Sequence, residues 1–130
     1  MKYTITGAID ANHNATFSVK ENSISFGVKK GADHLPNPVE LLLGSFAACC
    51  LKNVERFSEI LNFDYEGATI DIIGDRQENP TKLIGISYII SIKGTGVNLD
   101  LLHRNIQKYG TIYNTLKDMC DIQGELKMVD

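Results

Sequence analysis

The chain has 130 residues, of which 43% are hydrophobic and 22% are charged, an ordinary composition for a globular protein that excludes a fibre or a disordered chain. Its formal net charge of −3 gives no electrostatic footprint for nucleic acid or for an anionic membrane surface. A chain of this length can bury one hydrophobic core, so we expect a single domain over residues 1–130.

The N-terminal third alternates apolar and polar residues with a period of two, which predicts three short antiparallel strands. Breaks at Gly7, at DANHN and at KENS separate the three segments. The alternating apolar residues are Tyr3 and Ile5, then Phe17 and Val19, then Ile24, Phe26 and Val28.

A helix is predicted over residues 38–61, because its start carries clear signals. Asn37 is a good N-cap residue, Pro38 suits the first helical position, and Glu40 stands where it can close a capping box. The first three turns are apolar all round, which is typical of an enclosed helix rather than a surface helix.

Two strands are predicted next, GATIDIIGD and KLIGISYIISIKG, joined by a turn at residues 78–80. In the second strand large apolar residues alternate with small ones, which indicates one buried face. A second helix is predicted from Asn98 to Leu116, although Gly110 weakens its middle. A last strand ends in GELKMV. The order βββ-α-ββ-α-β predicts an α+β domain with a mostly antiparallel sheet and two helices.

The sequence shows no targeting or membrane segment. MKYTITGAID lacks the apolar stretch of a signal peptide, and the longest apolar run, LLLGSFAACCL, is too short to cross a bilayer. Three cysteines cannot all pair within one chain and lack the dense spacing of secreted disulfide-rich domains. We therefore expect a cytoplasmic protein without membrane or nucleic-acid partners.

Cys49 and Cys50 are adjacent in the first helix and point about 100° apart. Cys50 belongs to an apolar stripe and is predicted to be a small core residue. Cys49 lies on another face with Lys52 and Arg56, whose charges favour a reactive thiolate. The helical wheel alone leaves both a reactive and a buried Cys49 open. The stripe consists of Leu43, Phe46, Cys50, Val54, Phe57 and Leu61.

The third thiol, Cys120, shares a predicted strand face with Ile122, Leu126 and Met128, so core packing is its default interpretation. It is also the only distant thiol that could resolve an oxidised Cys49. The histidines are scattered and there is no CxxC or HxxxH motif, so we expect no metal site and no other cofactor.

The segment PNPVELLLGSFAACC resembles the signature of the OsmC/Ohr family, the osmotically inducible protein C and organic hydroperoxide resistance proteins. That signature has a P-x-E-L-L-L-type helix start, small residues and then a reactive cysteine, which aligns with Cys49. GDRQENPTKLIGISYIISIKG is similar to the family's central hairpin, and IQKYGTIYNTL is similar to its second helix and the following segment. The resemblance covers nearly the whole chain and is closest to the shorter OsmC-like branch.

The resemblance implies an OsmC-like fold, assembled as an intertwined homodimer with active sites at the subunit interface. It implies reduction of organic or hydrogen peroxides in oxidative-stress defence, with Cys49 as the peroxidatic thiolate that becomes a sulfenic acid. In the family a resolving cysteine then forms a disulfide, which a dithiol reductant reopens. The implied partners are a second copy of the chain, a small hydroperoxide and an external thiol or dithiol.

Three positions depart from the family pattern. Gly110 stands in the place of the resolving cysteine, Val39 replaces the glutamate that follows the helix-opening proline, and no arginine precedes Arg56. Glu40 matches the second acidic or polar position of the signature, and Glu40 and Arg56 are candidate binding residues. Cys120 or an external thiol is left as the resolving group.

Two alternatives to a peroxidase stay open. One is a non-catalytic OsmC-like protein that binds a small hydrophobic ligand in an apolar cleft of the dimer. The other is a redox sensor in which oxidation of Cys49 alters the contact with a partner.

Overall fold

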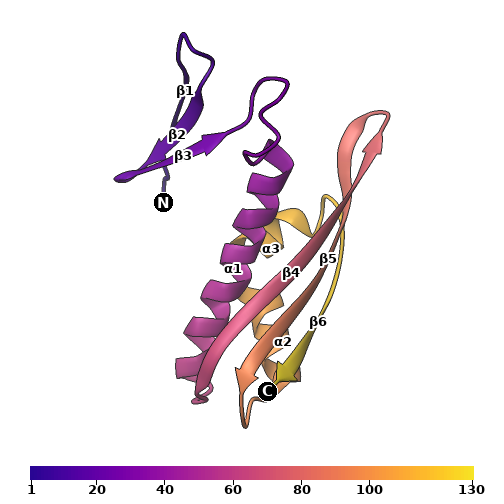
Figure 1. The fold of residues 1–130 in the computed structure, drawn as a ribbon. Coiled ribbons are helices and arrows are strands. Elements are labelled where there is room, and N and C mark those ends of the chain that lie inside the picture. The colour runs from indigo at the N-terminus through magenta and orange to yellow at the C-terminus, as the bar shows by residue number, and fades with distance from the viewer. The chain divides into compact units, whose positions relative to one another are not determined.

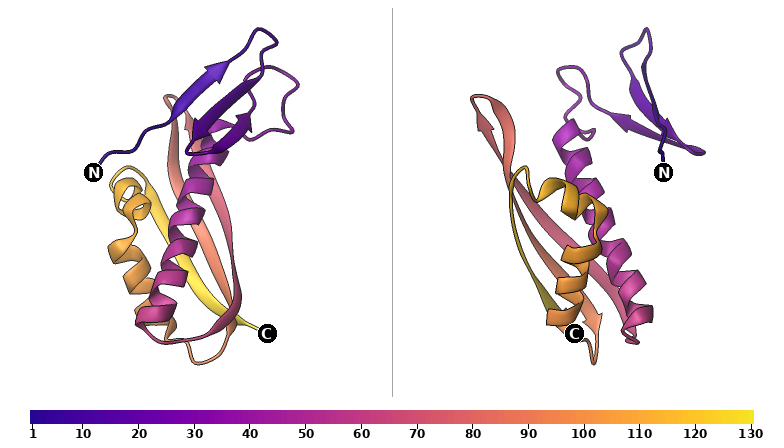
Figure 2. Two further views of the ribbon diagram at one scale, coloured as in Figure 1. Left: turned by 90° about the vertical axis from the view of Figure 1, so that its left-hand side faces the viewer. Right: turned by 180° about the vertical axis from the view of Figure 1, so that it is seen from behind.

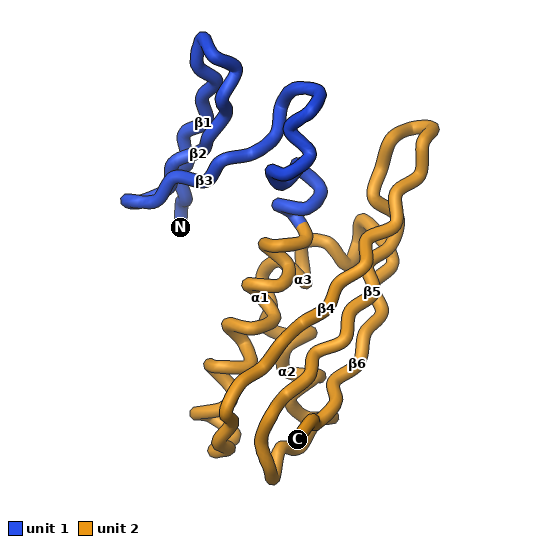
Figure 3. Tube along the Cα trace, viewed as in Figure 1, with its two compact units in different colours: residues 1–42 blue, residues 43–130 orange.

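The computed structural model describes residues 1–130 (Figure 1). The chain forms two compact units, residues 1–42 and residues 43–130 (Figure 3). Each unit contains one three-stranded sheet. The expectation of one domain over the whole chain stays a prediction.

The first unit holds an antiparallel sheet in the order β1-β2-β3, with bounds Thr6–Ile9, Ala15–Val19 and Asn22–Phe26. The three predicted strands are present, but the first begins after Ile5 and continues through Gly7, which the sequence pattern treats as a break. Gly7 pairs with Phe17 in the ladder, because a glycine keeps both backbone hydrogen-bonding groups. The first strand is therefore shifted along the chain relative to its prediction.

The long helix α1 (Pro38–Ile60) agrees with the predicted range of 38–61 to within one residue. It begins with a capping box, as predicted. The Glu40 N–H donates to Asn37 Oδ1 at 2.8 Å, and the Asn37 N–H donates to Glu40 Oε1 at 3.0 Å. No helix of the structure is both long enough and apolar enough to cross a membrane.

The second unit holds a sheet in the order β4-β5-β6, with bounds Tyr65–Glu78, Thr81–Gly94 and Asp121–Val129. β4 and β5 form the predicted antiparallel hairpin around residues 79–80. β6 pairs with β5 in parallel, because the intervening helices carry the chain back to the end of the sheet where β5 began. Three of the four strand pairings in the chain are antiparallel, so the prediction of a mostly antiparallel sheet is confirmed.

The predicted second helix is in fact two helices, α2 (Leu99–Tyr109) and α3 (Thr111–Leu116). Gly110 separates them with an extended backbone, φ −77° and ψ 113°. Its N–H still bonds to the Ile106 carbonyl at 3.0 Å, and its own carbonyl accepts from the Asn114 N–H at 2.8 Å. The order is therefore βββ-α-ββ-αα-β, and the prediction of two helices is corrected to three.

Residues 43–60 of α1 and the helix α2 cover the same face of the β4-β5-β6 sheet, as the views in Figure 2 show. The core between them contains alternate residues of β5 that are at most 2% exposed: Ile86, Tyr88, Ile90 and Ile92. The buried face predicted for this strand is therefore confirmed from Ile86 to Ile92, whereas Ile84, predicted on the same face, is 44% exposed. The sheet and these two helices hold the segment of α1 that carries the adjacent cysteines.

Candidate functional site

The two adjacent cysteines of α1 have different surroundings. Cys50 is 0% exposed in the core between α1 and the sheet, as the apolar stripe predicts. Burial raises the pKa of the Cys50 thiol to about 12, so this thiol stays protonated near neutral pH. Cys49 is partly exposed and forms no disulfide. Only Cys49 is therefore open to a ligand.

Cys49 lines a pocket of about 420 Å³, a size that suits a small molecule. One wall comes from α1 and supplies a thiol, an amide and two cations. The other wall comes from the α2–α3 junction and supplies an aromatic ring, a hydroxyl and an aliphatic side chain. No acidic side chain lines the pocket. The lining residues are Ser45, Ala48, Cys49, Lys52, Asn53, Arg56, Tyr109, Thr111 and Ile112.

Asn53 is the polar neighbour of the Cys49 sulfur. It is only 7% exposed. Its Nδ2 donates a 3.0 Å hydrogen bond to the Cys49 carbonyl oxygen and lies 4.0 Å from Cys49 Sγ. The spacing of four residues on one helix places the two side chains on the same face.

Gly110 lies next to Cys49, between the lining residues Tyr109 and Thr111. A Cβ atom on residue 110 would be 3.1 Å from Cys49 Sγ, 3.1 Å from Tyr113 Cβ and 2.8 Å from the Ile106 carbonyl oxygen. The backbone φ of −77° is accessible to any residue, so the close approach and not the dihedral angle requires glycine. The structure therefore brings residue 110, the position that the resemblance aligns with the family's resolving cysteine, directly to the Cys49 sulfur.

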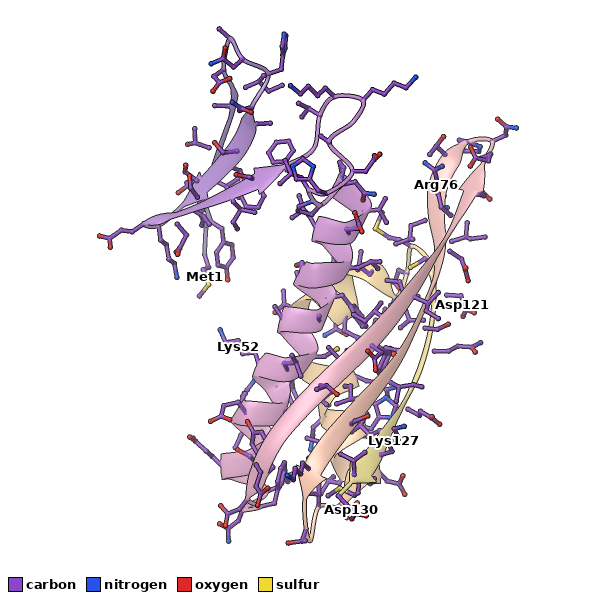
Figure 4. All side chains as sticks on the ribbon, in the orientation of Figure 1. Met1, Lys52, Arg76, Asp121, Lys127 and Asp130 are labelled. Carbon is purple, nitrogen blue, oxygen red and sulfur yellow. The ribbon has the colours of Figure 1, made fainter.

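Arg56 and Lys52 supply the positive charge of the pocket. The Arg56 guanidinium lies over two aromatic rings, with Cζ 5.2 Å from the Phe57 centroid and 5.6 Å from the Tyr109 centroid. Lys52 extends from the side of α1 that faces away from the sheet (Figure 4). Neither cation takes part in a salt bridge. Their charges are therefore not neutralised by ion pairing within the chain.

The other two predicted site residues have different surroundings. The Glu40 carboxylate accepts a hydrogen bond in the capping box of α1. Cys120 immediately precedes β6, where its thiol donates to the Leu116 carbonyl oxygen at 3.7 Å, and it does not line the Cys49 pocket. Asp121, the residue after Cys120, lies on the opposite side of the second unit from Lys52 in Figure 4. The structure thus brings Cys49 and Arg56 into one pocket and leaves Cys120 outside it.

The sequence pattern misses the second wall of the pocket. It predicts one continuous helix from Asn98 to Leu116, whereas Tyr109, Thr111 and Ile112 all line the pocket because the chain turns at Gly110. The one signal for this wall was the alignment of Gly110 with the family's resolving cysteine, a position that must lie within reach of Cys49. No group of three or more His, Cys, Asp or Glu side chains is placed to hold a metal ion.

The sequence matches the model of the family described as OsmC-like protein over residues 31–125. No curated protein gives a match to the sequence. Among solved structures, an OsmC-like protein from Mycoplasma pneumoniae is similar with a TM-score of 0.89 and 19% identity, covering 100% of this chain and 99% of that chain. An organic hydroperoxide resistance protein OsmC from Legionella pneumophila has a TM-score of 0.75 at 15% identity, covering 98% and 97% of the two chains.

The organic hydroperoxide resistance protein OhrB of Bacillus subtilis has a TM-score of 0.62 at 14% identity, covering 98% of each chain. At such low sequence identities the TM-scores show a shared fold alone, and that fold agrees with the predicted OsmC-like architecture. The family match extends over well more than half of the sequence. The chain therefore belongs to the OsmC-like protein family.

Proposed function

We propose that this protein is a thiol-dependent hydroperoxide reductase of the OsmC-like family, with a site that lacks the usual resolving cysteine. The observation that carries the proposal is the pocket in which the accessible Cys49 meets a buried amide and two cations free of salt bridges. A cationic, partly exposed environment is the one that favours a reactive thiolate. Two neighbours of the same fold are named organic hydroperoxide resistance proteins, which supports a peroxide as substrate.

In the first proposed step the Cys49 thiolate attacks one oxygen of the peroxide O–O bond. An S–O bond forms as the O–O bond breaks, so sulfur is oxidised to sulfenic acid and the peroxide is reduced. The leaving alkoxide takes a proton from solvent and departs as an alcohol. Lys52 and Arg56 stabilise both the thiolate and the negative charge that develops on the leaving oxygen.

The sulfenic acid must then be resolved by a thiol from elsewhere, since residue 110 carries no side chain. We infer that an external thiol condenses with it, which forms a mixed disulfide and releases water. A second thiol then attacks the mixed disulfide, regenerates Cys49 and leaves as the oxidised reductant. Cys120 is the alternative resolver within the chain, and Cys120→Ser separates the two routes.

The experiment is to measure consumption of tert-butyl hydroperoxide by purified protein, with and without an added thiol. We expect consumption that depends on the thiol and disappears in Cys49→Ser. Cys120→Ser should keep the activity, because an external thiol does not need it. Equal consumption by wild type and Cys49→Ser would reject the proposal.

A second candidate function is non-catalytic binding of a small apolar ligand. Val39 in place of the family's glutamate favours it, because an acidic residue expected in the peroxidase pattern is missing. In that case an apolar ligand would bind equally well to wild type and Cys49→Ser, with no thiol-dependent turnover. Calorimetric titration of both proteins distinguishes the two functions.

We also propose that the protein is a cytoplasmic homodimer. The support is a set of large apolar side chains on the first unit that are exposed in a single chain, since such residues are commonly covered in an assembly. Light scattering at micromolar concentration should give twice the chain mass, and a clean monomer would reject the dimer. The exposed residues are Tyr3, Ile5, Ile9, Ile24 and Val28.

A further inference from the structure

We propose that the Cys49 pocket selects its external thiol by negative charge, so that the resolving reductant is a small thiol that carries a carboxylate or a similar anionic group. This inference rests on the proposed function, because it names the chemical class of the reductant at the same site. Neither the family match nor the structural neighbours assign a reductant to this chain.

The two charged side chains that line the pocket are both cations. Lys52 and Arg56 line it without any acidic neighbour in the lining, and neither forms a salt bridge. Glu55, which lies between them in the sequence, accepts a hydrogen bond from the Tyr65 hydroxyl and does not line the pocket. This local excess of positive charge contrasts with the net charge of −3 for the whole chain. A ligand that brings negative charge is therefore favoured here.

Asn53 provides an independent sign of a ligand. This side chain is 7% exposed and lines the pocket. Its Nδ2 donates to the Cys49 carbonyl oxygen, and its Oδ1 accepts no hydrogen bond within the chain. An amide oxygen without a partner in the chain is free to accept a hydrogen bond from a molecule that enters the pocket.

The spacing along α1 sets the length of the reductant. Lys52 follows Cys49 by three residues and Arg56 by seven, which places their Cα atoms about 5 Å and about 10 Å further along the helix axis. The Arg56 guanidinium is kept near the pocket by its contact with the Tyr109 ring. A thiol that reaches Cys49 Sγ can thus bring an anionic group 5 to 10 Å away, roughly, to one cation or to both. That span fits a thiol acid or a small peptide thiol.

The test uses disulfide exchange, which requires no peroxide. Treating Cys120→Ser protein with 2,2′-dithiodipyridine gives a mixed disulfide between Cys49 and thiopyridine, and an incoming thiol then releases 2-thiopyridone. The thiols are 3-mercaptopropionate (anionic), 2-mercaptoethanol (neutral) and cysteamine (cationic). Each rate is expressed per thiolate and divided by the rate of the same thiol with a small-molecule disulfide.

We expect the anionic thiol to react about fivefold faster than the neutral one, and the cationic thiol to be slowest. The preference should shrink in 1 M salt, where the Debye length falls to about 3 Å. The double variant Lys52→Gln/Arg56→Gln should reduce it to about twofold or less. The matched control is Lys127→Gln on β6, which lies far from Lys52 (Figure 4) and should leave the preference unchanged.

The inference would be overturned if the three thiols reacted at equal relative rates, or if the preference for the anionic thiol survived in the double variant. So would a preference for anionic over neutral hydroperoxides without any preference among thiols, because the cations would then serve the peroxide. Peroxide consumption is measured separately on the same proteins. If the anionic thiol is preferred but Cys49 does not react with peroxide, the inference about thiol recognition is supported and the proposed peroxidase function fails.

Discussion

The substitution Gly110→Cys tests the geometry of the proposed site most directly. A Cβ at residue 110 would lie 3.1 Å from Cys49 Sγ. In a disulfide with an S–S bond of about 2.05 Å, the Cβ of one cysteine lies about 3 Å from the sulfur of the other. The new thiol would therefore reach Cys49 without a large movement of α1. The same Cβ would lie 2.8 Å from the Ile106 carbonyl oxygen, so the backbone at this turn must shift slightly.

These two effects have opposite signs, and their size can be worked out. Crowding at the turn should cost the reduced variant about 1–3 kcal/mol in free energy of unfolding. The disulfide between residues 49 and 110 closes a loop of roughly 60 residues, which in the chain-entropy model is worth about 4 kcal/mol. The oxidised variant should therefore be more stable than wild type by roughly 1–3 kcal/mol, and the reduced variant less stable than wild type.

The assays are urea unfolding and intact-mass analysis after graded additions of peroxide. Gly110→Cys should lose about two mass units and resist further oxidation, whereas wild type without added thiol should proceed to sulfinic acid. Gly110→Ser is the matched control, because it introduces similar crowding without a thiol. A rapid loss of two mass units in wild type that disappears in Cys120→Ser would identify Cys120 as the resolver and refute the reasoning.

Alkylation of the native protein followed by peptide mass mapping should label Cys49 well before Cys50, because burial raises the pKa of Cys50 to about 12; the reverse order would contradict the assignment of the two thiols. Gly124→Ala should lower the free energy of unfolding by about 1–3 kcal/mol or more, because a Cβ there would overlap the Tyr88 ring, and a urea midpoint equal to that of wild type would argue against this packing. Burial lowers the pKa of His103, whose Nε2 lies 2.6 Å from the Tyr88 hydroxyl. The unfolded chain therefore takes up this proton near pH 6.5 while the folded chain does not, so stability should fall as pH drops below that value, and His103→Gln should flatten the slope.

The start of α1 could be predicted from the sequence because its signals are local. Asn37, Pro38 and Glu40 lie within one turn of each other, and their hydrogen bonds need no contact from elsewhere in the chain. The separation of Cys49 from Cys50 followed equally from helix geometry, and the burial of Cys50 agrees with it. Predictions of this kind depend only on spacing along one element.

The break between α2 and α3 could not be predicted in the same way. Apolar residues continue at intervals of three and four on both sides of Gly110, so the helical period alone suggests one helix. What marks this position in the structure is a tertiary contact, the close approach of residue 110 to Cys49, about 60 residues earlier in the chain. The wall formed by Tyr109 and Ile112 depends on that contact. Only the family resemblance connected residue 110 with the reactive thiol.

Under the proposed mechanism, the two cations compensate for the lack of a thiol at Gly110. A site with its own resolving cysteine captures the sulfenic acid within the chain, whereas this site must receive a thiol before a second peroxide over-oxidises the same sulfur. Thiol and peroxide compete for one pocket, and size gives little discrimination between two small molecules. Charge discriminates well, because a simple hydroperoxide is neutral and a thiol acid is not. Lys52 and Arg56 would therefore raise the local concentration of the reductant over that of the oxidant, which is how a chain without a resolving cysteine could turn over repeatedly.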